Sequence, residues 1–357
     1  MPRPAIGSGY SPRPHALTLP IRFVVDKCTV RVYVTGATGY IGSAICRRLV
    51  EASHDVRALV RHTSNRDVVE RLGVACFEGD LRDRVSMREG MSGADWVIHA
   101  AAELDFKAPR ERIAAANVAG SENVASLAWK LGVGRVLHIS SIAVFGGSAA
   151  DGSPSTEESP QALPLPNAYC ETKHAGEQCF RTFEEKGLRL NIVYPSLVYG
   201  PPSKKGGINS FLRALLLGRL PAVVGADRVS SWVYLDDLVD GVLRVMEDAE
   251  PGAHYLLSGE KASTTQIVEA VCTLGGVSSP RLNLSPFTAR MLLAALGPLA
   301  ALVGRPLPFN SDQLASLSRH WHFDDSRARR DLDWRPRGLD RGLPPTIDFL
   351  KTTIRQE

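Results

Sequence analysis

Residues 32–51 read VYVTGATGYIGSAICRRLVE, and this stretch decides the fold. An alternating apolar run leads into the glycine pattern GxxGxxG at Gly36, Gly39 and Gly42, and a helical pattern continues to about Ala52. Glycines in this position permit a tight turn and bring the backbone close to a pyrophosphate at a helix N-terminus. The same glycines could merely pack a helix on a strand. Their place at the first strand-to-helix turn favours a dinucleotide-binding loop.

Strand and helix patterns then alternate up to about Gly200, at the spacing of βαβ units. This alternation predicts an α/β fold, a Rossmann-type doubly wound parallel sheet. The expected strands are Val30–Val34, Val56–Val60, Ala75–Phe77, Trp96–His99, Val136–Ile139 and Leu190–Val193.

The alternation breaks after Gly200, which suggests three parts. We expect an N-terminal tail over residues 1–28 and an NAD(P)-binding Rossmann domain over 29–200. Residues 201–357 are expected to form mainly a smaller C-terminal substrate-binding lobe. Such a lobe should cover the carboxyl ends of the strands, where doubly wound folds bind their ligands.

The charge of the chain is concentrated at its start. The net charge is +4, and residues 1–31 hold five basic residues against one acidic residue. The remainder is nearly neutral, so we expect no nucleic-acid partner. The first 28 residues are rich in proline, which is typical of a disordered tail, of a wrongly assigned translation start or of an organelle transit peptide.

The six cysteines show no CxxC pairing, which favours a reduced, cytoplasmic setting and no metal site.

The end of the second strand bears on the choice of cofactor. An acidic residue there would bind the ribose 2′-hydroxyl of NAD, whereas this chain has Arg61, with Arg66 close behind. A guanidinium suits a 2′-phosphate, although it could also stack on the adenine that both cofactors share. NADP(H) is therefore favoured, and NAD(H) stays open.

A tyrosine and a lysine form the candidate catalytic pair. Tyr169 and Lys173 stand in the pattern YxxxK, and positions i and i+4 share one helix face. A nearby ammonium stabilises a phenolate and lowers its pKa. The pattern is common by chance, but Ser140 and Ser141 follow the fifth strand and could complete the group.

In this order the chain carries TGATGYIG, HAAA, NVAGSENV, HISSIAVFG, YCETK and YPSLVYGP. From Thr29 to Leu350 it resembles the extended short-chain dehydrogenase/reductases, particularly dihydroflavonol-reductase-like and farnesol-dehydrogenase-like members. The closer likeness rests on VRALVRHTSN, GRLPAVVGADRVSSWVYLDDLVDG and RHWHFDDSRARRDLDWRPRGLDRGL. The chain departs from the pattern at Phe145, where epimerases often carry tyrosine, and in the alanines before Asn117.

The resemblance implies specific roles. Ser141, rather than Ser140, would bind the substrate oxygen, Tyr169 would transfer the proton, and Lys173 would hold the nicotinamide ribose and lower the Tyr169 pKa. Asn117 would order the proton relay. The implied cofactor contacts are Gly36, Thr38, Gly39, Tyr40, Ile41, Gly42, Arg61, Asp80, Leu81, Ala100, Ala101, Tyr169, Lys173, Pro195 and Val198.

Residues Met291–Val303 form an apolar run that is too short to span a bilayer. We expect a buried helix pair broken at Gly297-Pro298. The alternatives are an apolar lid over the substrate and a monotopic membrane contact. No transmembrane span is expected, and a homodimer is left open.

Three functions remain in competition. The first is an oxidoreductase that interconverts an alcohol and a carbonyl on a hydrophobic small molecule. The second is a nucleotide-sugar epimerase or dehydratase, in which Arg228 could grip a diphosphate. The third is a non-catalytic protein that senses NAD(P); the intact Ser141, Tyr169 and Lys173 speak against it.

Overall fold

The computed structural model describes residues 29–105, 108–203, 205–302 and 310–357, with the backbone alone over 297–302. The predictions made for residues 1–28 and for Val303 lie outside the described residues.

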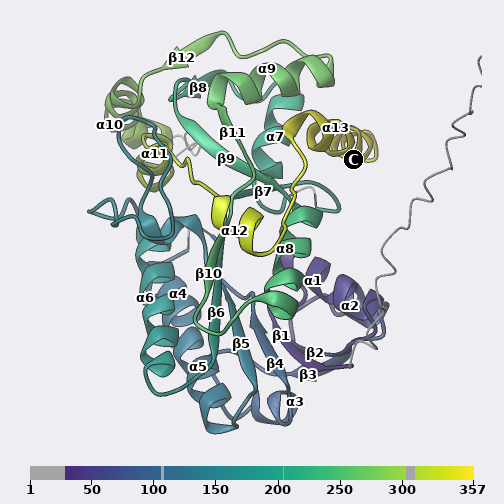
Figure 1. Ribbon diagram of the computed structural model, residues 1–357. Coiled ribbons are helices and arrows are strands. Elements are labelled where there is room, and N and C mark those ends of the chain that lie inside the picture. Colours follow the sequence, from purple (N-terminus) through teal and green to yellow (C-terminus); the bar gives the residue numbers. More distant parts are fainter. Residues whose placement is uncertain (1–28, 106–107, 204, 303–309) are drawn as a thin grey trace, which may run out of the picture.

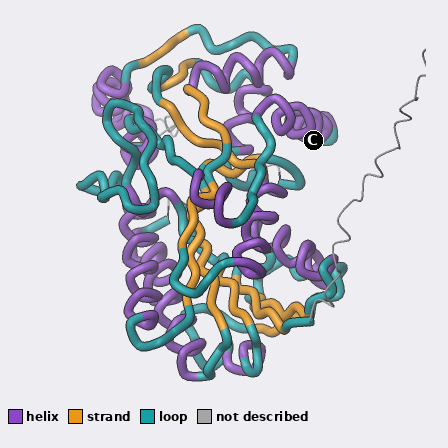
Figure 2. The backbone as a smooth tube through the Cα atoms, viewed as in Figure 1, coloured by secondary structure: helices purple, strands orange, loops and turns teal. Residues whose placement is uncertain are grey.

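A seven-stranded parallel sheet forms the centre of the larger lobe (Figures 1 and 2). Its order is β10-β6-β5-β4-β1-β2-β3, which contains the strand order of dinucleotide-binding doubly wound sheets. The predicted fold class is therefore confirmed. The strands are β1 (Arg31–Thr35), β2 (Asp55–Val60), β3 (Ala75–Glu78), β4 (Trp96–His99), β5 (Arg135–Ile139), β6 (Leu190–Pro195) and β10 (His254–Leu257).

Helices cover both faces of this sheet (Figure 1). Strand β1 shows why, because Val32 and Val34 join the core under one helical layer and Tyr33 joins the core under the other. A strand buried on both faces is expected to be apolar throughout. One layer holds α1 (Tyr40–Glu51), α2 (Asp67–Glu70), α8 (Leu235–Asp248) and α12 (Ser326–Asp331). The other holds α3 (Arg88–Met91), α4 (Arg110–Ala114), α5 (Gly120–Lys130) and α6 (Ala168–Glu184).

The smaller lobe begins where β6 runs on into β7 (Leu197–Tyr199), with Ser196 alone between them. Strands β7, β9 (Val229–Tyr234) and β11 (Glu260–Ser263) form a second sheet, and β8 (Ala222–Val224) pairs with β12 (Leu282–Leu284). The core of this lobe is separate and is built around Trp232 and Leu212. Its helices are α7 (Asn209–Leu216), α9 (Thr264–Gly275), α10 (Pro286–Leu302), α11 (Ser311–Leu317) and α13 (Leu339–Arg355).

The two lobes do not divide the sequence at Gly200. Helix α8 and strand β10 lie beyond that residue, yet both belong to the larger lobe. Trp334, further still along the chain, is fully buried in the same core. The C-terminal part of the chain thus crosses back to complete the sheet.

The apolar run near residue 291 differs from the prediction of a buried helix pair. It lies in one helix, α10, which passes through positions 297 and 298. Ala289 is buried, but Phe287 and Met291 are 74% and 56% exposed. Over 286–296, the part of α10 whose side chains the structure describes, few residues dock on the core and most side chains are exposed. No helix in the described residues is long and apolar enough to cross a membrane.

Candidate active site

The glycine loop connects β1 to α1 and is tightly constrained. Gly36 has φ +73°, and a Cβ placed there would lie 2.6 Å from the backbone nitrogen of Ala101. A Cβ on Gly42 would lie 2.1 Å from the Gly36 carbonyl oxygen. Only glycine fits both positions. The loop therefore lies directly against Ala101, two residues after the end of β4.

The N-terminus of α1 is suited to an anion. Gly39 occupies the N-cap with no side-chain cap, and the first turn holds no acidic residue. The free N–H groups of a helix N-terminus bind phosphate oxygens well. Thr38 lies in the turn before the cap, and Ile41 packs against the core under the helix. These residues fit the pyrophosphate of a dinucleotide.

Tyr40 links the glycine loop to the second lobe. Its hydroxyl donates to the Gly200 carbonyl oxygen at 2.6 Å. A Cβ on Gly206 would lie 2.5 Å from the Tyr40 ring, so the chain after β7 packs directly on this tyrosine. Burial raises the pKa of Tyr40, which keeps the hydroxyl a donor. The two lobes are thus tied together next to the candidate cofactor loop.

Two arginines follow β2, and they differ in whether an acidic side chain neutralises them. Arg66 forms an ion pair with Glu78, the last residue of β3. Arg61 is exposed, and no ion pair or side-chain hydrogen bond is recorded for it among the described residues. His62 lies 3.4 Å from the same Glu78 carboxylate. Arg61 is therefore the guanidinium of this pair left available for a ligand.

Asp80 and Leu81 follow β3 at the same edge of the sheet. The Arg82 guanidinium donates two hydrogen bonds to Asp80, at 2.9 and 2.8 Å, and lowers the pKa of that carboxyl to about 2. The Leu81 carbonyl accepts from the Asn123 side chain at 2.9 Å. An Asp80 contact with adenine would therefore be made by a carboxylate that Arg82 already orients.

The two serines after β5 have different tasks. Ser140 is buried and donates to the Glu177 carboxylate at 2.7 Å, so it faces the interior between β5 and α6. Ser141 caps the short 3₁₀-helix η2 (Ile142–Phe145), with its oxygen accepting from the Ala143 N–H at 3.1 Å. Ser141 also shares a side-chain hydrogen bond with Tyr169. The structure thus brings Ser141, and not Ser140, to the candidate tyrosine.

Tyr169 stands in the first turn of α6, where Asn167 is the N-cap and accepts from the Cys170 N–H at 3.0 Å. Burial raises the pKa of the Tyr169 hydroxyl, and the Ser141 hydrogen bond opposes that shift. The pKa is therefore raised, not lowered as the sequence suggested, because desolvation outweighs the neighbouring polar groups. A neutral phenol is the form that can donate a proton.

Lys173 lies one turn further along α6 and is 4% exposed. Its ammonium donates to the Ile139 carbonyl oxygen at 3.0 Å. Burial lowers the pKa of Lys173 to about 8, and the Glu177 carboxylate acts in the opposite direction. The ammonium therefore predominates near neutrality and is lost as the pH rises through about 8.

Asn117 lies in a π-helical turn, Ala115–Ala119, that joins α4 to α5. The Asn117 amide accepts from the Glu103 N–H at 2.7 Å and donates to the Thr172 hydroxyl on α6 at 3.1 Å. Single π-helical turns occur often at functional sites. Asn117 is thus fixed against the helix that carries Tyr169 and Lys173.

Pro195 and Val198 lie on either side of the step from β6 to β7. Pro195 ends β6 opposite Leu257 of β10, and Val198 is buried in β7 opposite Val233. Between them, the Ser196 hydroxyl donates to the Ser258 carbonyl oxygen at 2.6 Å. The turn is therefore rigid, which suits a surface that positions a ligand.

Glu177 was missed from the sequence. It is buried, and its carboxylate also accepts from the Tyr194 hydroxyl at 3.0 Å and from the Arg181 guanidinium at 2.9 Å. A signal was present, because Tyr169, Lys173 and Glu177 recur every four residues on one face of α6. No group of three or more metal-ligating side chains is found in the described residues.

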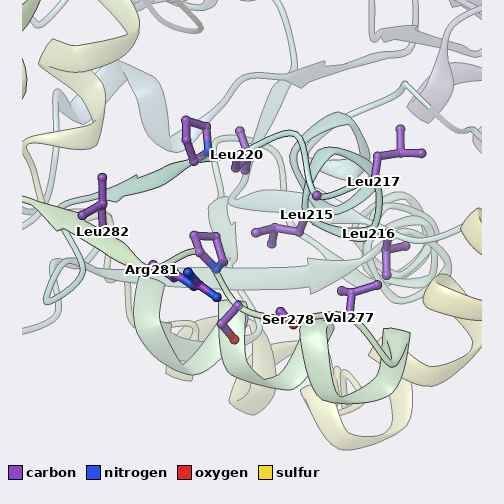
Figure 3. Close-up of a pocket in the computed structure, with 12 residues that line it drawn as sticks. Leu215, Leu216, Leu217, Leu220, Val277, Ser278, Arg281 and Leu282 are labelled. Carbon is purple, nitrogen blue, oxygen red and sulfur yellow. The ribbon is translucent and has the colours of Figure 1, made fainter.

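Two cavities of the described structure have neither Ser141 nor Tyr169 in their lining. One, of about 370 Å³, adjoins the N-terminus of α6 and is lined by Ala108, Arg110, Ile113, Pro166, Asn167, Ala168, Glu171 and Asp312. The larger, of about 670 Å³, lies between the end of α7 and the loop before β12 (Figure 3). Leucines of α7 and Leu282 line it, with Arg281 at its side. The geometry of the side chains, rather than cavity size, identifies the candidate site.

The sequence matches a family model described as the NAD dependent epimerase/dehydratase family over residues 32–258. This range holds every residue assigned above to the catalytic group and the cofactor loop.

Three relatives are similar over most of the chain. Sterol demethylase protein B of Methylococcus capsulatus is 30% identical, covering 88% of this chain and 93% of its own. A putative dihydroflavonol 4-reductase of Synechocystis is 28% identical, covering 89% and 94%. A 4-hydroxy-2-methyl-3-oxo-4-farnesyl-3,4-dihydroquinoline-1-oxide ketoreductase of Stigmatella aurantiaca is 29% identical, covering 87% and 95%.

Solved structures show the same fold. The crystal structure of gox2253 matches with a TM-score of 0.79 and 28% identity, covering 92% of this chain and 99% of the other. DesIV, a dTDP-glucose 4,6-dehydratase from Streptomyces venezuelae with NAD and TYD bound, matches with a TM-score of 0.74 and 23% identity, covering 91% and 98%.

Proposed function

The chain belongs to the NAD dependent epimerase/dehydratase family, and from that premise we propose that this oxidoreductase interconverts an alcohol and a carbonyl on a largely apolar small molecule. The observation that carries the proposal is the hydrogen-bonded pair of Ser141 and Tyr169, one helical turn from the Lys173 ammonium. This group combines a proton donor, an oxygen-binding hydroxyl and a fixed cation.

The protein's own groups would act as follows. The nicotinamide cofactor supplies or accepts the hydride when it is bound. Ser141 would hydrogen-bond the substrate oxygen, and the neutral Tyr169 hydroxyl would donate its proton to that oxygen in the reductive direction. The Lys173 ammonium would hold the nicotinamide ribose. In the oxidative direction Tyr169 would take the proton back.

NADP(H) is the proposed cofactor. Arg61 is exposed and forms no ion pair with any residue of the described part of the chain, which supports this choice, because a guanidinium can bind a 2′-phosphate with two charge-assisted hydrogen bonds. Arg66 contributes less, since Glu78 already neutralises it.

The test of this choice is to titrate NADPH and NADH into the wild type, Arg61→Ala and the matched control Arg66→Ala. We expect Arg61→Ala to lower the preference for NADPH by about tenfold or more, in keeping with one charge-assisted contact. Arg66→Ala should change the preference much less. An unchanged ratio in Arg61→Ala would contradict this assignment.

An apolar substrate is supported by the names of two relatives, which refer to a sterol and to a farnesyl-substituted quinoline oxide. A second support concerns Arg228, the residue considered for gripping a diphosphate. It forms an ion pair with Asp227 at 3.1 Å and bonds the His320 ring at 2.8 Å. A guanidinium with both of these partners is poorly placed to grip a nucleotide sugar.

A substrate panel tests the proposal directly. Isoprenoid alcohols and aldehydes, steroids, flavanonols and UDP-sugars would each be incubated with both cofactors, while NAD(P)H absorbance is followed and products are identified by mass. We expect stoichiometric cofactor turnover with one or more apolar compounds. Conversion of UDP-sugars alone, without net cofactor change, would establish the epimerase alternative. Cofactor binding with no turnover of any member would favour a sensing role.

A further inference from the structure

Helix α10 exposes an apolar surface that the fold does not use. Phe287 and Met291, one turn apart, are 74% and 56% exposed. Leu292 and Leu296, also one turn apart but about 140° further around the helix, are 39% and 45% exposed. A helix that is apolar all round is normally buried in a core or in a membrane. Among the α10 side chains that the structure describes, those of 286–296, Ala289 and Leu293 contact the small cluster formed by Val224, Leu284 and Leu314.

The charge around this helix is one-sided. From Ala270 to Ser311 the sequence contains three arginines and no aspartate or glutamate. Two of the arginines, Arg281 and Arg290, are described and exposed, and no ion pair is recorded for either within the described residues. Elsewhere the described surface arginines are often paired, as with Arg47 and Asp236 or Arg327 and Glu158. The α10 region therefore combines apolar side chains with unpaired positive charge.

We propose that α10 lies flat on an anionic lipid bilayer, with Phe287 and Met291, its most exposed pair of large apolar side chains, entering the boundary between headgroups and acyl chains. Apolar side chains beside arginines are the usual composition of interfacial helices. Arg281 and Arg290 would contact the negative surface. The helix has 17 residues and lies along the surface rather than across it.

The apolar strip extends beyond the helix. Leu282 of β12 is 57% exposed and lies four residues before Pro286, the first residue of α10. It lines the groove of about 670 Å³ shown in Figure 3, together with leucines of α7 and beside Arg281. The groove, β12 and α10 thus place apolar side chains and positive charge on consecutive elements of the smaller lobe.

Charge also favours a membrane over a second copy of this chain. A symmetric pairing through α10 would bring Arg290 of each copy into the same apolar interface, with no acidic residue in the segment to neutralise it. Burying unpaired charges in an apolar interface is costly. Anionic lipid headgroups supply the missing negative charge at the edge of the apolar surface.

The proposed membrane surface is connected to the candidate active site. Helix α10 packs on α11 through Leu314. The Asn167 side chain, two residues before Tyr169, donates to the Ser316 hydroxyl of α11 at 2.8 Å. A bilayer under α10 would therefore lie on the side of the molecule where α6 begins. Membrane binding itself does not depend on the proposed reaction.

The test is sedimentation of the full-length protein with vesicles of phosphatidylcholine alone and of phosphatidylcholine with phosphatidylglycerol. We expect binding to the anionic vesicles and much weaker binding to the neutral ones. Phe287→Ser with Met291→Ser should weaken the anionic binding about tenfold or more, because two apolar side chains no longer enter the lipid. Arg290→Glu should weaken it by a similar factor.

Val85→Ser is the matched control, because Val85 is 78% exposed but lies between β3 and α3 on the larger lobe. It should bind vesicles like the wild type. Circular dichroism and the oligomeric state by light scattering would be recorded for every variant. Unchanged binding by the double variant would overturn the proposal and assign any lipid contact to another segment, such as the basic first 31 residues. Absence of vesicle binding, with a wild-type oligomer that the double variant dissociates, would equally overturn it in favour of self-association.

Discussion

Helices α6 and α10 have the same length, 17 residues, and opposite relations between polarity and burial. Helix α6 buries two opposite charges, Lys173 and Glu177, each 4% exposed. Helix α10 carries a single charged residue, yet Phe287 is 74% exposed. The difference shows that burial follows the partners available to a side chain. Lys173 and Glu177 of α6 have hydrogen-bonding partners inside the protein, whereas Phe287 and Met291 of α10 have few contacts with the rest of the described fold.

The largest effect is expected from a substitution in α6 that tests whether Tyr169 takes part in catalysis. Tyr169→Phe removes only the transferable proton and the bond with Ser141, so we expect turnover to fall by about 10²–10⁴-fold. Cofactor affinity, measured by fluorescence titration, should change little. Wild-type turnover in a correctly folded Phe variant would remove Tyr169 from the catalytic group and weaken the contrast with α10.

Glu177 tests whether the buried charges of α6 depend on each other. Glu177→Ala leaves Ser140, Arg181 and Tyr194 without their shared acceptor, and we expect a loss of about 3–5 kcal/mol in the free energy of unfolding. Denaturant unfolding measures this loss.

The milder Glu177→Gln variant reports on Lys173 through the pH profile of turnover. In the wild type we expect activity to fall as the pH rises through about 8, because the Lys173 ammonium deprotonates there. The Glu177 carboxylate raises the Lys173 pKa, so its removal should move this alkaline limb to lower pH. An alkaline limb that stays in place, with substrate affinity unchanged, would mean that Glu177 is structural only.

Gly176 tests how closely α6 is packed. A Cβ there would lie 2.1 Å from the Asn117 carbonyl oxygen. We expect Gly176→Ala to lower the free energy of unfolding by about 1–3 kcal/mol, in spite of the better helix propensity of alanine. Gln178→Ala, at an exposed position of the same helix, should stay within about 0.5 kcal/mol of the wild type. Equal stability of the two variants would show that the backbone of the π-helical turn shifts and makes room for the added methyl group.

The smallest effect is expected on α10. Phe287→Ala should change the free energy of unfolding by no more than about 0.5 kcal/mol in the absence of lipid. Phe180→Ala, at a fully buried position of α6, should cost about 3–5 kcal/mol. A large loss in the Phe287 variant would mean that this side chain supports the fold, which would remove the contrast between the helices.

Much of the larger lobe could be predicted because its signals are local. The glycine motif, the apolar strands and the YxxxK spacing each occupy a few neighbouring residues, and a family model matches over 32–258. The π-helical turn at Asn117 could not be predicted, because it depends on contacts with Glu103 and Thr172. The direction of the Tyr169 pKa shift was wrong because burial is a property of the whole fold. The roles assigned to the site residues stay predictions until the variants are measured.

The exposure of the apolar side chains of α10 could not be predicted from the sequence either. An apolar run predicts burial, but it does not say whether the rest of the chain supplies a surface to bury it. The structure supplies contacts at Ala289 and Leu293 and leaves Phe287 and Met291 outside. Because the buried helix pair is not observed, the two alternatives for this segment, an apolar lid over the substrate and a monotopic membrane contact, stay open as hypotheses.

Strand β10 has a consequence for how the protein is made. It pairs with β6 along one edge of the large sheet, yet it lies about 60 residues later in the chain, after β7, α7, β8 and β9 of the smaller lobe. During synthesis, the edge of β6 that pairs with β10 stays unpaired until β10 has been made. The apolar side of α1 likewise stays uncovered until α8 has been made. A chain cut after residue 200 would expose both surfaces and should aggregate. We therefore expect that residues 29–200 do not fold as an independent N-terminal domain. The two lobes should fold together, after the C-terminal part of the chain has been synthesised.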